Sequence, residues 1–116
     1  MSAPPEESIL LRIFVRDGHR HHHLPLFEAI VLAARKSGLS GATALHGILG
    51  FGRSTALHQD GPLVPTADRP VVVEIVDSPQ KIEVFLPVLD GMMSSGLITM
   101  ERARVLSSTA SSTAKQ

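Results

Sequence analysis

The stretch His46-Gly47-Ile48-Leu49-Gly50-Phe51-Gly52-Arg53 has the residue types best suited to binding an anion. Glycine tolerates positive φ and leaves its backbone N–H uncovered, so a glycine-rich turn can present several amide donors to a phosphate. Arg53 would add a forked, permanently charged guanidinium. The alternative interpretation is a tight turn or bulge at the end of a strand. The predicted ligand-binding residues are Gly47, Gly50, Phe51, Gly52 and Arg53.

A second candidate site is the histidine run from His19 to His23, which Arg20 interrupts. Neutral imidazole binds divalent transition metals well, so His19, His21 and His23 could converge on one cation. The alternative is a solvated loop before a helix, which binds metal only adventitiously. No Asp or Glu follows at the spacing of a metalloenzyme, and His-Glu-x-x-His is absent.

Catalytic signatures are missing from the sequence. It contains no Gly-x-Ser-x-Gly elbow, no Walker A motif and no Gly-x-Gly-x-x-Gly that opens a helix. His46 and His58 flank the glycine stretch, but a histidine on or near a strand more often serves as a structural hydrogen-bonding residue. We therefore predict that the protein is not an enzyme and has no catalytic residue.

Composition narrows the function classes further. Lys plus Arg and Asp plus Glu each total 11, and the only aromatic residues among Phe, Trp and Tyr are four phenylalanines. The chain therefore lacks both the basic field and the stacking platforms typical of nucleic-acid binding. It also has no cysteine and no apolar run of about 20 residues. We predict one soluble, cytoplasmic domain that does not insert into a membrane.

Hydrophobic periodicity predicts alternating strands and helices. Ile9–Val15 is a strand buried on both faces, and Pro25–Ser37 is a helix that ends before Gly38. Ala42–Leu49 is a second strand, which leads into the glycine stretch. The segment 54–69 is a long connection with too little apolar content to fix its own structure.

The second half of the chain repeats this order. Pro70–Val76 is the clearest strand, with Glu74 in it as a possible partner of Arg12 or Arg53. Ser78 is an N-cap for a helix that starts at Pro79 and carries an apolar stripe past Pro87 towards Gly96. Leu97–Met100 and Ala103–Leu106 complete the last strand. The predicted regions are a flexible N-terminus over residues 1–8, a domain over 9–106 and a disordered tail over 107–116.

This order is strand, helix, strand, strand, helix, strand, which is the ferredoxin-like βαββαβ arrangement of the α+β class. An antiparallel sheet of this kind packs two helices on one of its faces. The predicted strands are apolar on both faces, as Leu10 and Phe14 against Leu11, Ile13 and Val15 illustrate. A second chain is therefore predicted to cover the other face.

The sequence resembles a PII-like family of unknown function, domain of unknown function one-ninety. Gly50-Phe51-Gly52-Arg53 is similar to the Gly-Phe-Gly-Arg that opens the nucleotide-contacting loop of PII signalling proteins. The other matching segments together cover about residues 9 to 105: Leu10–Phe14, Pro25–Val31, Gly41–Leu45, Gly47–Gly52, Pro70–Asp77 and Lys81–Glu83.

The resemblance implies a homotrimer with an adenine nucleotide between neighbouring subunits. The chain departs from the PII pattern at two places. Ser54-Thr55-Ala56 follows the arginine where PII proteins have Gln-Lys-Gly, and Ser94-Ser95-Gly96-Leu97 replaces the Gly-Asp-Gly-Lys phosphate loop.

The resulting hypothesis is a small homotrimeric signalling protein. It binds a nucleotide or another phosphorylated metabolite in the clefts between subunits, and it regulates a partner protein, such as a transporter or an enzyme, through the loop 54–69. The alternative hypothesis is a divalent-cation-binding protein that uses the loop His19–His23.

Overall fold

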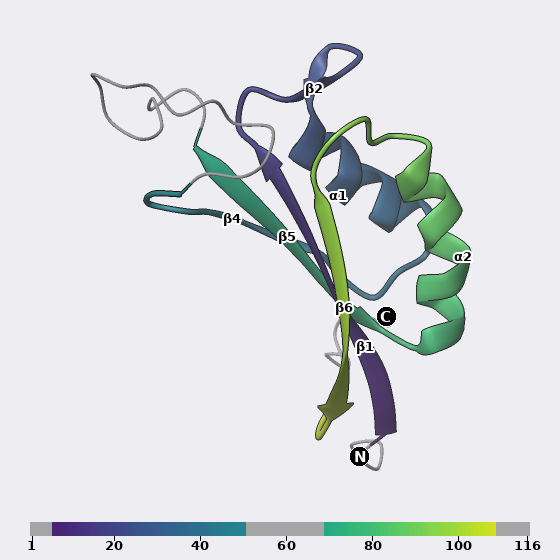
Figure 1. Ribbon diagram of the computed structural model, residues 1–116. Coiled ribbons are helices and arrows are strands. Elements are labelled where there is room, and N and C mark those ends of the chain that lie inside the picture. Colours follow the sequence, from purple (N-terminus) through teal and green to yellow (C-terminus); the bar gives the residue numbers. More distant parts are fainter. Residues whose placement is uncertain (1–5, 51–68, 109–116) are drawn as a thin grey trace, which may run out of the picture.

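The computed structural model of the chain describes residues 6–50 and 69–108 (Figure 1). Four strands form one antiparallel sheet in the order β4-β5-β1-β6, and α1 and α2 lie together on one of its faces. The predicted ferredoxin-like α+β architecture is confirmed. The elements are β1 (Glu6–Arg16), β2 (Arg20–His21), β3 (Leu24–Pro25), α1 (Leu26–Lys36), β4 (Thr43–His46), β5 (Pro70–Asp77), α2 (Pro79–Asp90) and β6 (Leu97–Val105).

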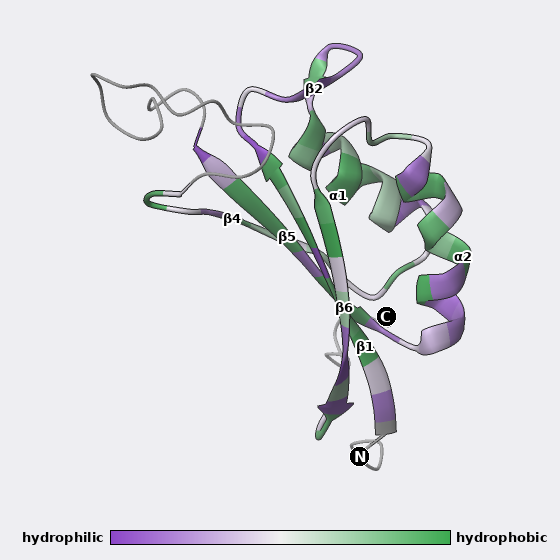
Figure 2. Ribbon diagram, viewed as in Figure 1, coloured by the Kyte–Doolittle hydropathy of each residue, from purple (hydrophilic) through white to green (hydrophobic). Residues whose placement is uncertain are grey.

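The core lies between the sheet and the two helices. Alternate residues of β1 and β5 point towards the helices, because side chains alternate between the two faces of a strand. Figure 2 shows hydrophobic residues on the sides of α1 and α2 that face the sheet. The buried cluster consists of Leu11, Ile13, Val15, Leu26, Ile30, Ala34, Val71, Val73, Ile75, Ile82, Phe85 and Leu89. None of the helices in the described ranges is long and apolar enough to cross a bilayer.

Local signals set the helix boundaries. α1 occupies nearly the predicted range, and Gly38 follows it with a φ of +83°. The Ser78 side chain caps α2 by accepting the N–H of Lys81 at 3.2 Å. α2 passes through Pro87 as a single helix but ends at Asp90. Met92 and Met93, in the turn after α2, still pack against the core, so the apolar stripe of the sequence continues beyond the end of the helix.

Strand lengths differ from the prediction at three places. β1 begins at Glu6 rather than Ile9, so residues 6–8 of the predicted flexible N-terminus are strand and pair with Ala103–Val105. β6 is one continuous strand rather than two pieces. β4 covers only Thr43–His46, because its partner β5 starts at Pro70, which has no N–H to extend the ladder.

Asp77 joins three segments at the end of β5. Its buried carboxylate accepts the backbone N–H of Ser40 at 2.8 Å and the backbone N–H of Ser78 at 2.8 Å. Burial acts to raise the pKa of Asp77, but the hydrogen bonds from Ser40 and Ser78 and the nearby charge of Lys81 together lower it. The ionised carboxylate therefore ties the loop after α1 to the start of α2.

Asp77→Asn should lower the free energy of unfolding near pH 7 by about 1–3 kcal/mol, because a neutral oxygen accepts weaker hydrogen bonds. Since the pKa is lowered in the folded state, the wild-type advantage is complete above about pH 4. It is lost as the pH falls through the folded pKa. Urea unfolding near pH 7 and near pH 3 measures this difference. The exposed Asp90→Asn is the control, and an Asp77→Asn loss of equal size at both pH values would contradict the assignment.

Candidate functional site

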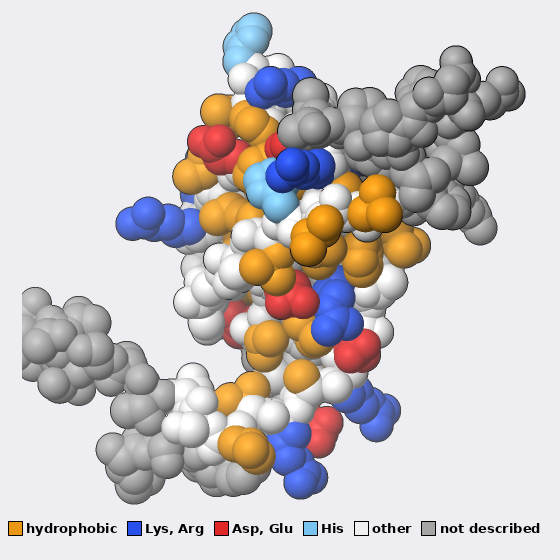
Figure 3. Space-filling model, turned by 90° about the vertical axis from the view of Figure 1, so that its left-hand side faces the viewer, with side chains coloured by type: hydrophobic (Ala, Val, Ile, Leu, Met, Phe, Trp, Pro, Cys, Tyr) orange, Lys and Arg blue, Asp and Glu red, His pale blue; other side chains and the backbone are white. Residues whose placement is uncertain are grey.

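The sheet face opposite the helices is uncovered within the described residues, as predicted. The registers of β1 with β5 and β6, and of β4 with β5, place the same alternate residues of each strand on this open face. Figure 3 looks onto this side and shows hydrophobic side chains gathered around a few charged ones. The apolar residues of the open face include Leu10, Phe14, Leu45, Val72, Val76 and Leu97.

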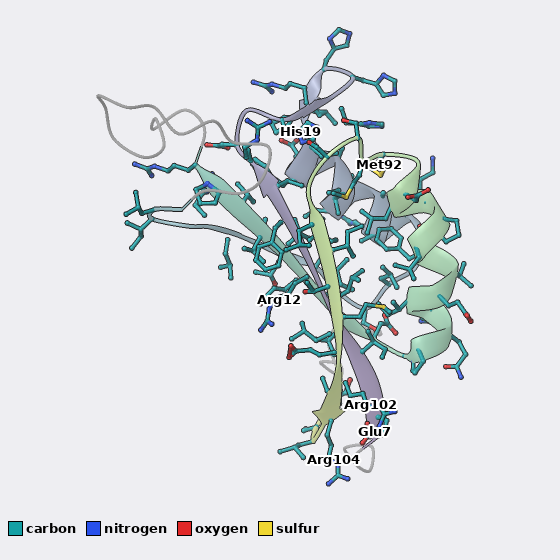
Figure 4. The ribbon with its side chains drawn as sticks, viewed as in Figure 1. Glu7, Arg12, His19, Met92, Arg102 and Arg104 are labelled. Atoms are coloured by element: carbon teal, nitrogen blue, oxygen red, sulfur yellow. The ribbon has the colours of Figure 1, made fainter. Side chains whose placement is uncertain are left out.

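A charged triad lies in the middle of the open face. Arg12 Nε donates to Glu74 Oε2 at 3.0 Å, and Arg12 Nη1 donates to Glu101 Oε2 at 3.4 Å. The hydrogen bond that Arg12 donates to Glu74 raises the pKa of Arg12. Burial acts to lower this pKa, and the negative charges of Glu101 and Glu74 raise it further. Figure 4 shows the Arg12 side chain pointing away from the helices. Of the two partners considered for Glu74, the structure pairs Arg12 with it, whereas Arg53 lies outside the described residues.

Beside the triad, the open face is hollowed near the end of β4. This shallow depression has a volume of about 270 Å³. Its walls are mostly apolar, with the Arg12–Glu74 pair on one side and the beginning of the glycine stretch on the other. The lining residues are Arg12, Phe14, Leu45, His46, Gly47, Val72 and Glu74. The hollow can hold a flat apolar group and offer it one carboxylate and one guanidinium.

The structure assigns Gly47 a packing role rather than the predicted anion-binding role. Its N–H donates to the carbonyl oxygen of Pro70 at 2.7 Å, so this amide is not available to a phosphate. A Cβ at Gly47 would lie 2.8 Å from Pro70 Cγ, which explains the glycine by close approach. Neither Gly47 nor Gly50 uses the positive φ that glycine tolerates. The described residues do not include Phe51, Gly52, Arg53 or residues 54–68 of the predicted loop.

His46 serves as a structural contact, in agreement with the simpler interpretation. Its Nε2 lies 3.2 Å from Asp17 Oδ1, and its ring packs edge-on against Phe27 with ring centroids 5.7 Å apart. These contacts fix the end of β4 against the loop after β1 and the first turn of α1. The other histidine considered, His58, lies outside the described residues.

The histidine run forms a short hairpin that was not predicted. β2 and β3 pair Arg20 with Pro25 and His21 with Leu24, and His22 has a φ of +59° in the turn. His19 Nε2 instead lies 3.5 Å from Ser94 Oγ. The convergence of His19, His21 and His23 that a cation site requires is not observed. Across residues 6–50 and 69–108, no three His, Asp or Glu side chains are placed to hold a metal.

Sequence comparison shows the family of the chain. The family model DUF190, described as "Uncharacterized ACR", matches residues 8–105. The chain belongs to the DUF190 family. A UPF0166 protein of Aquifex aeolicus is 34% identical to the DUF190 chain over 97 residues, which are 84% of this chain and 91% of that protein. A UPF0166 protein of Methanocaldococcus jannaschii is 31% identical over 98 residues, which are 83% of this chain and 89% of that protein.

Solved structures of PII-like proteins share the fold of the DUF190 chain. A putative PII-like signalling protein from Thermus thermophilus superposes with a TM-score of 0.61 at 15% identity, covering 90% of this chain and 94% of that one. CPII from Thiomonas intermedia, bound to ADP and bicarbonate, superposes with a TM-score of 0.56 at 16% identity, covering 87% and 90%. The predicted relationship to PII-like proteins is confirmed at the level of the fold.

The packing role of Gly47 in the DUF190 chain can be tested against Gly50. Gly47→Ala should lower the free energy of unfolding by about 1–3 kcal/mol, because the new Cβ would push against the Pro70 ring. Gly50→Ala is the matched control, since its Cβ would lie at an ordinary 3.5 Å from Pro70 Cγ. Its effect should stay within about 0.5 kcal/mol. Equal losses in chemical denaturation would show that the Pro70 contact does not account for Gly47.

Proposed function

We propose that this DUF190 protein is a homotrimeric PII-like regulator that binds an adenine nucleotide or another phosphorylated metabolite between subunits. The observation that carries the proposal is the apolar hollow on the open face, directly beside the first glycine of the stretch 47–53. Small-molecule sites are typically concave, largely apolar and supplied with a few polar groups. The proposal assigns the protein no catalytic step.

The ligand would be divided between two parts of the site. The base would enter the hollow, where Phe14, Leu45 and Val72 offer apolar contact and Glu74 offers a hydrogen-bond acceptor. The phosphate would bind the chain beyond Gly47, where Gly50, Phe51, Gly52 and Arg53 remain the predicted contacts. Because the Gly47 amide is already paired with Pro70, it has no part in this proposed phosphate site.

Homotrimer formation would complete the site. The hollow is shallow and opens onto an apolar sheet face that neither helix covers, so a neighbouring subunit is needed to enclose a ligand there. The nucleotide bound to CPII supports the choice of an adenine nucleotide as the first ligand to test. Ligand binding would then order the loop 54–69 and change how it contacts a partner protein, such as a transporter or an enzyme.

Leu45→Asp should abolish both nucleotide binding and self-association, because it places a charge at the rim of the hollow and on the open face. Leu32→Asp is the matched control: Leu32 lies on α1 and is 49% exposed, against 51% for Leu45. Calorimetric titration with ADP, AMP and ATP measures binding, and sedimentation equilibrium measures the assembly. Equal behaviour of the two variants would contradict the site.

Arg53→Ala tests the phosphate half of the site separately. Loss of a charge-assisted hydrogen-bonding partner should weaken nucleotide binding by about 10- to 100-fold. The same substitution at the exposed Arg35 on α1 should leave the affinity unchanged. Wild-type affinity in Arg53→Ala, or no heat with any nucleotide on the unmodified protein, would refute nucleotide binding at the glycine stretch.

A further inference from the structure

The charged residues of the open face lie at opposite ends of the hollow. Side chains alternate along β1, so the register with β5 places Arg12, Phe14 and Arg16 in turn on the open face. Phe14 lines the hollow, and Arg12 borders one end of it. Arg16 follows about 7 Å beyond Phe14 along the strand, towards the other end. β1 therefore supplies one guanidinium to each end.

The Arg12 end has more negative than positive charge. Arg12 donates to Glu74 at 3.0 Å and to Glu101 at 3.4 Å, so one guanidinium stands between two carboxylates. An anionic group is disfavoured at this end, because it would approach two negative charges and only one positive charge. A group that donates a hydrogen bond suits it better, since the Glu74 carboxylate lines the hollow.

The Arg16 end leads to the glycine stretch. Arg16 is opposite Pro70 on β5, and the carbonyl oxygen of Pro70 accepts the N–H of Gly47 at 2.7 Å. Gly47 also lines the hollow. Arg16 therefore lies in the same row across the sheet as the first residue of the stretch 47–53, away from the charged triad.

This second end has an excess of positive charge. Arg69 precedes Pro70, and its carbonyl oxygen accepts the backbone N–H of Asp17 at 2.8 Å. The Asp17 carboxylate lies 3.2 Å from His46 Nε2. Counted over the described residues, this end has two arginines and one carboxylate. A guanidinium has five N–H donors, so Arg16 can bind an anion in addition to the contacts that it makes within the protein.

We propose that the hollow binds its ligand in one direction, with the phosphate at Arg16 and an amino group of the base at Glu74. An adenine nucleotide matches this charge separation, because adenine has an exocyclic amino group that donates hydrogen bonds and the phosphate is attached through the ribose. The reverse direction would bring the phosphate to two carboxylates. This inference rests on the proposed nucleotide site and adds the residues that set the direction of the ligand.

Calorimetric titration of the full chain with AMP and with adenosine separates the phosphate from the base. Arg16→Gln should weaken AMP binding by about 10- to 100-fold, because a charge-assisted contact is lost. The affinity for adenosine should stay unchanged, which also shows that the variant folds. Arg16→Lys keeps the charge without the forked geometry and should weaken AMP binding less. Arg35→Gln, on the exposed side of α1, is the matched control and should bind both ligands as the wild type does.

Inosine monophosphate tests the Glu74 end on the unmodified protein. It has a carbonyl oxygen in place of the exocyclic amino group of AMP, so it presents an acceptor to a carboxylate that can only accept. It should therefore bind about tenfold more weakly than AMP, or worse.

Three outcomes would overturn the inference. Arg16→Gln could keep the wild-type affinity for AMP, and Arg16→Lys serves for the same comparison if Arg16→Gln does not fold. AMP and adenosine could be weakened equally, which would mean that Arg16 supports the fold rather than the phosphate. Inosine monophosphate could bind as tightly as AMP. A wild type that binds neither AMP nor adenosine would instead refute the proposed nucleotide site itself, whereas the three outcomes above leave that site standing.

Discussion

The sheet has two apolar faces, but the helices of the described chain cover only one of them, and the rest of the structure depends on this difference. β1 and β5 are apolar on both faces, yet the described chain supplies only two helices, and both pack on the same side. Leu11, Ile13 and Val15 reach the core, whereas Leu10 and Phe14, between and beside them, do not. Such a strand cannot be satisfied by one helical layer, because its side chains alternate between the faces. The open face and its hollow both follow from this constraint.

The open face is not a simple apolar patch, because the charged Arg12–Glu74 pair lies within it. Directly opposed residues of β1 and β5 bring the two side chains together at 3.0 Å, on the same face as Phe14 and Val72. A charged pair within apolar surroundings favours partners that can match its geometry and disfavours indiscriminate contact. The same pair also lines the hollow, so one interaction shapes both the surface for association and the candidate ligand site.

The sequence was sufficient for features with local causes. Ser78 and Pro79 marked the start of α2, and the valine-rich run marked β5. The partner of Glu74 was left open between Arg12 and Arg53, because it depends on the register of β1 against β5. Features that depend on long-range register could not be predicted. Gly47 is a glycine because Pro70, at the start of β5, approaches it, and Glu101 joins the triad only through the register of β6 against β1. The end of α2 could not be predicted from its apolar stripe either, because Met92 and Met93 in the following turn also pack against the core.

The hollow and the triad share Arg12 and Glu74, and this limits the ligands that the hollow could accept. Glu74 Oε2 already accepts from Arg12 Nε at 3.0 Å, so a ligand group that hydrogen-bonds to Glu74 would have to share the carboxylate with Arg12. Arg12 also donates to Glu101 Oε2 on β6 at 3.4 Å, so a change at the hollow would reach the middle of the open face through one side chain. If a ligand in the hollow and a neighbouring subunit on the open face both contact Arg12, each would change the affinity for the other to an equal extent.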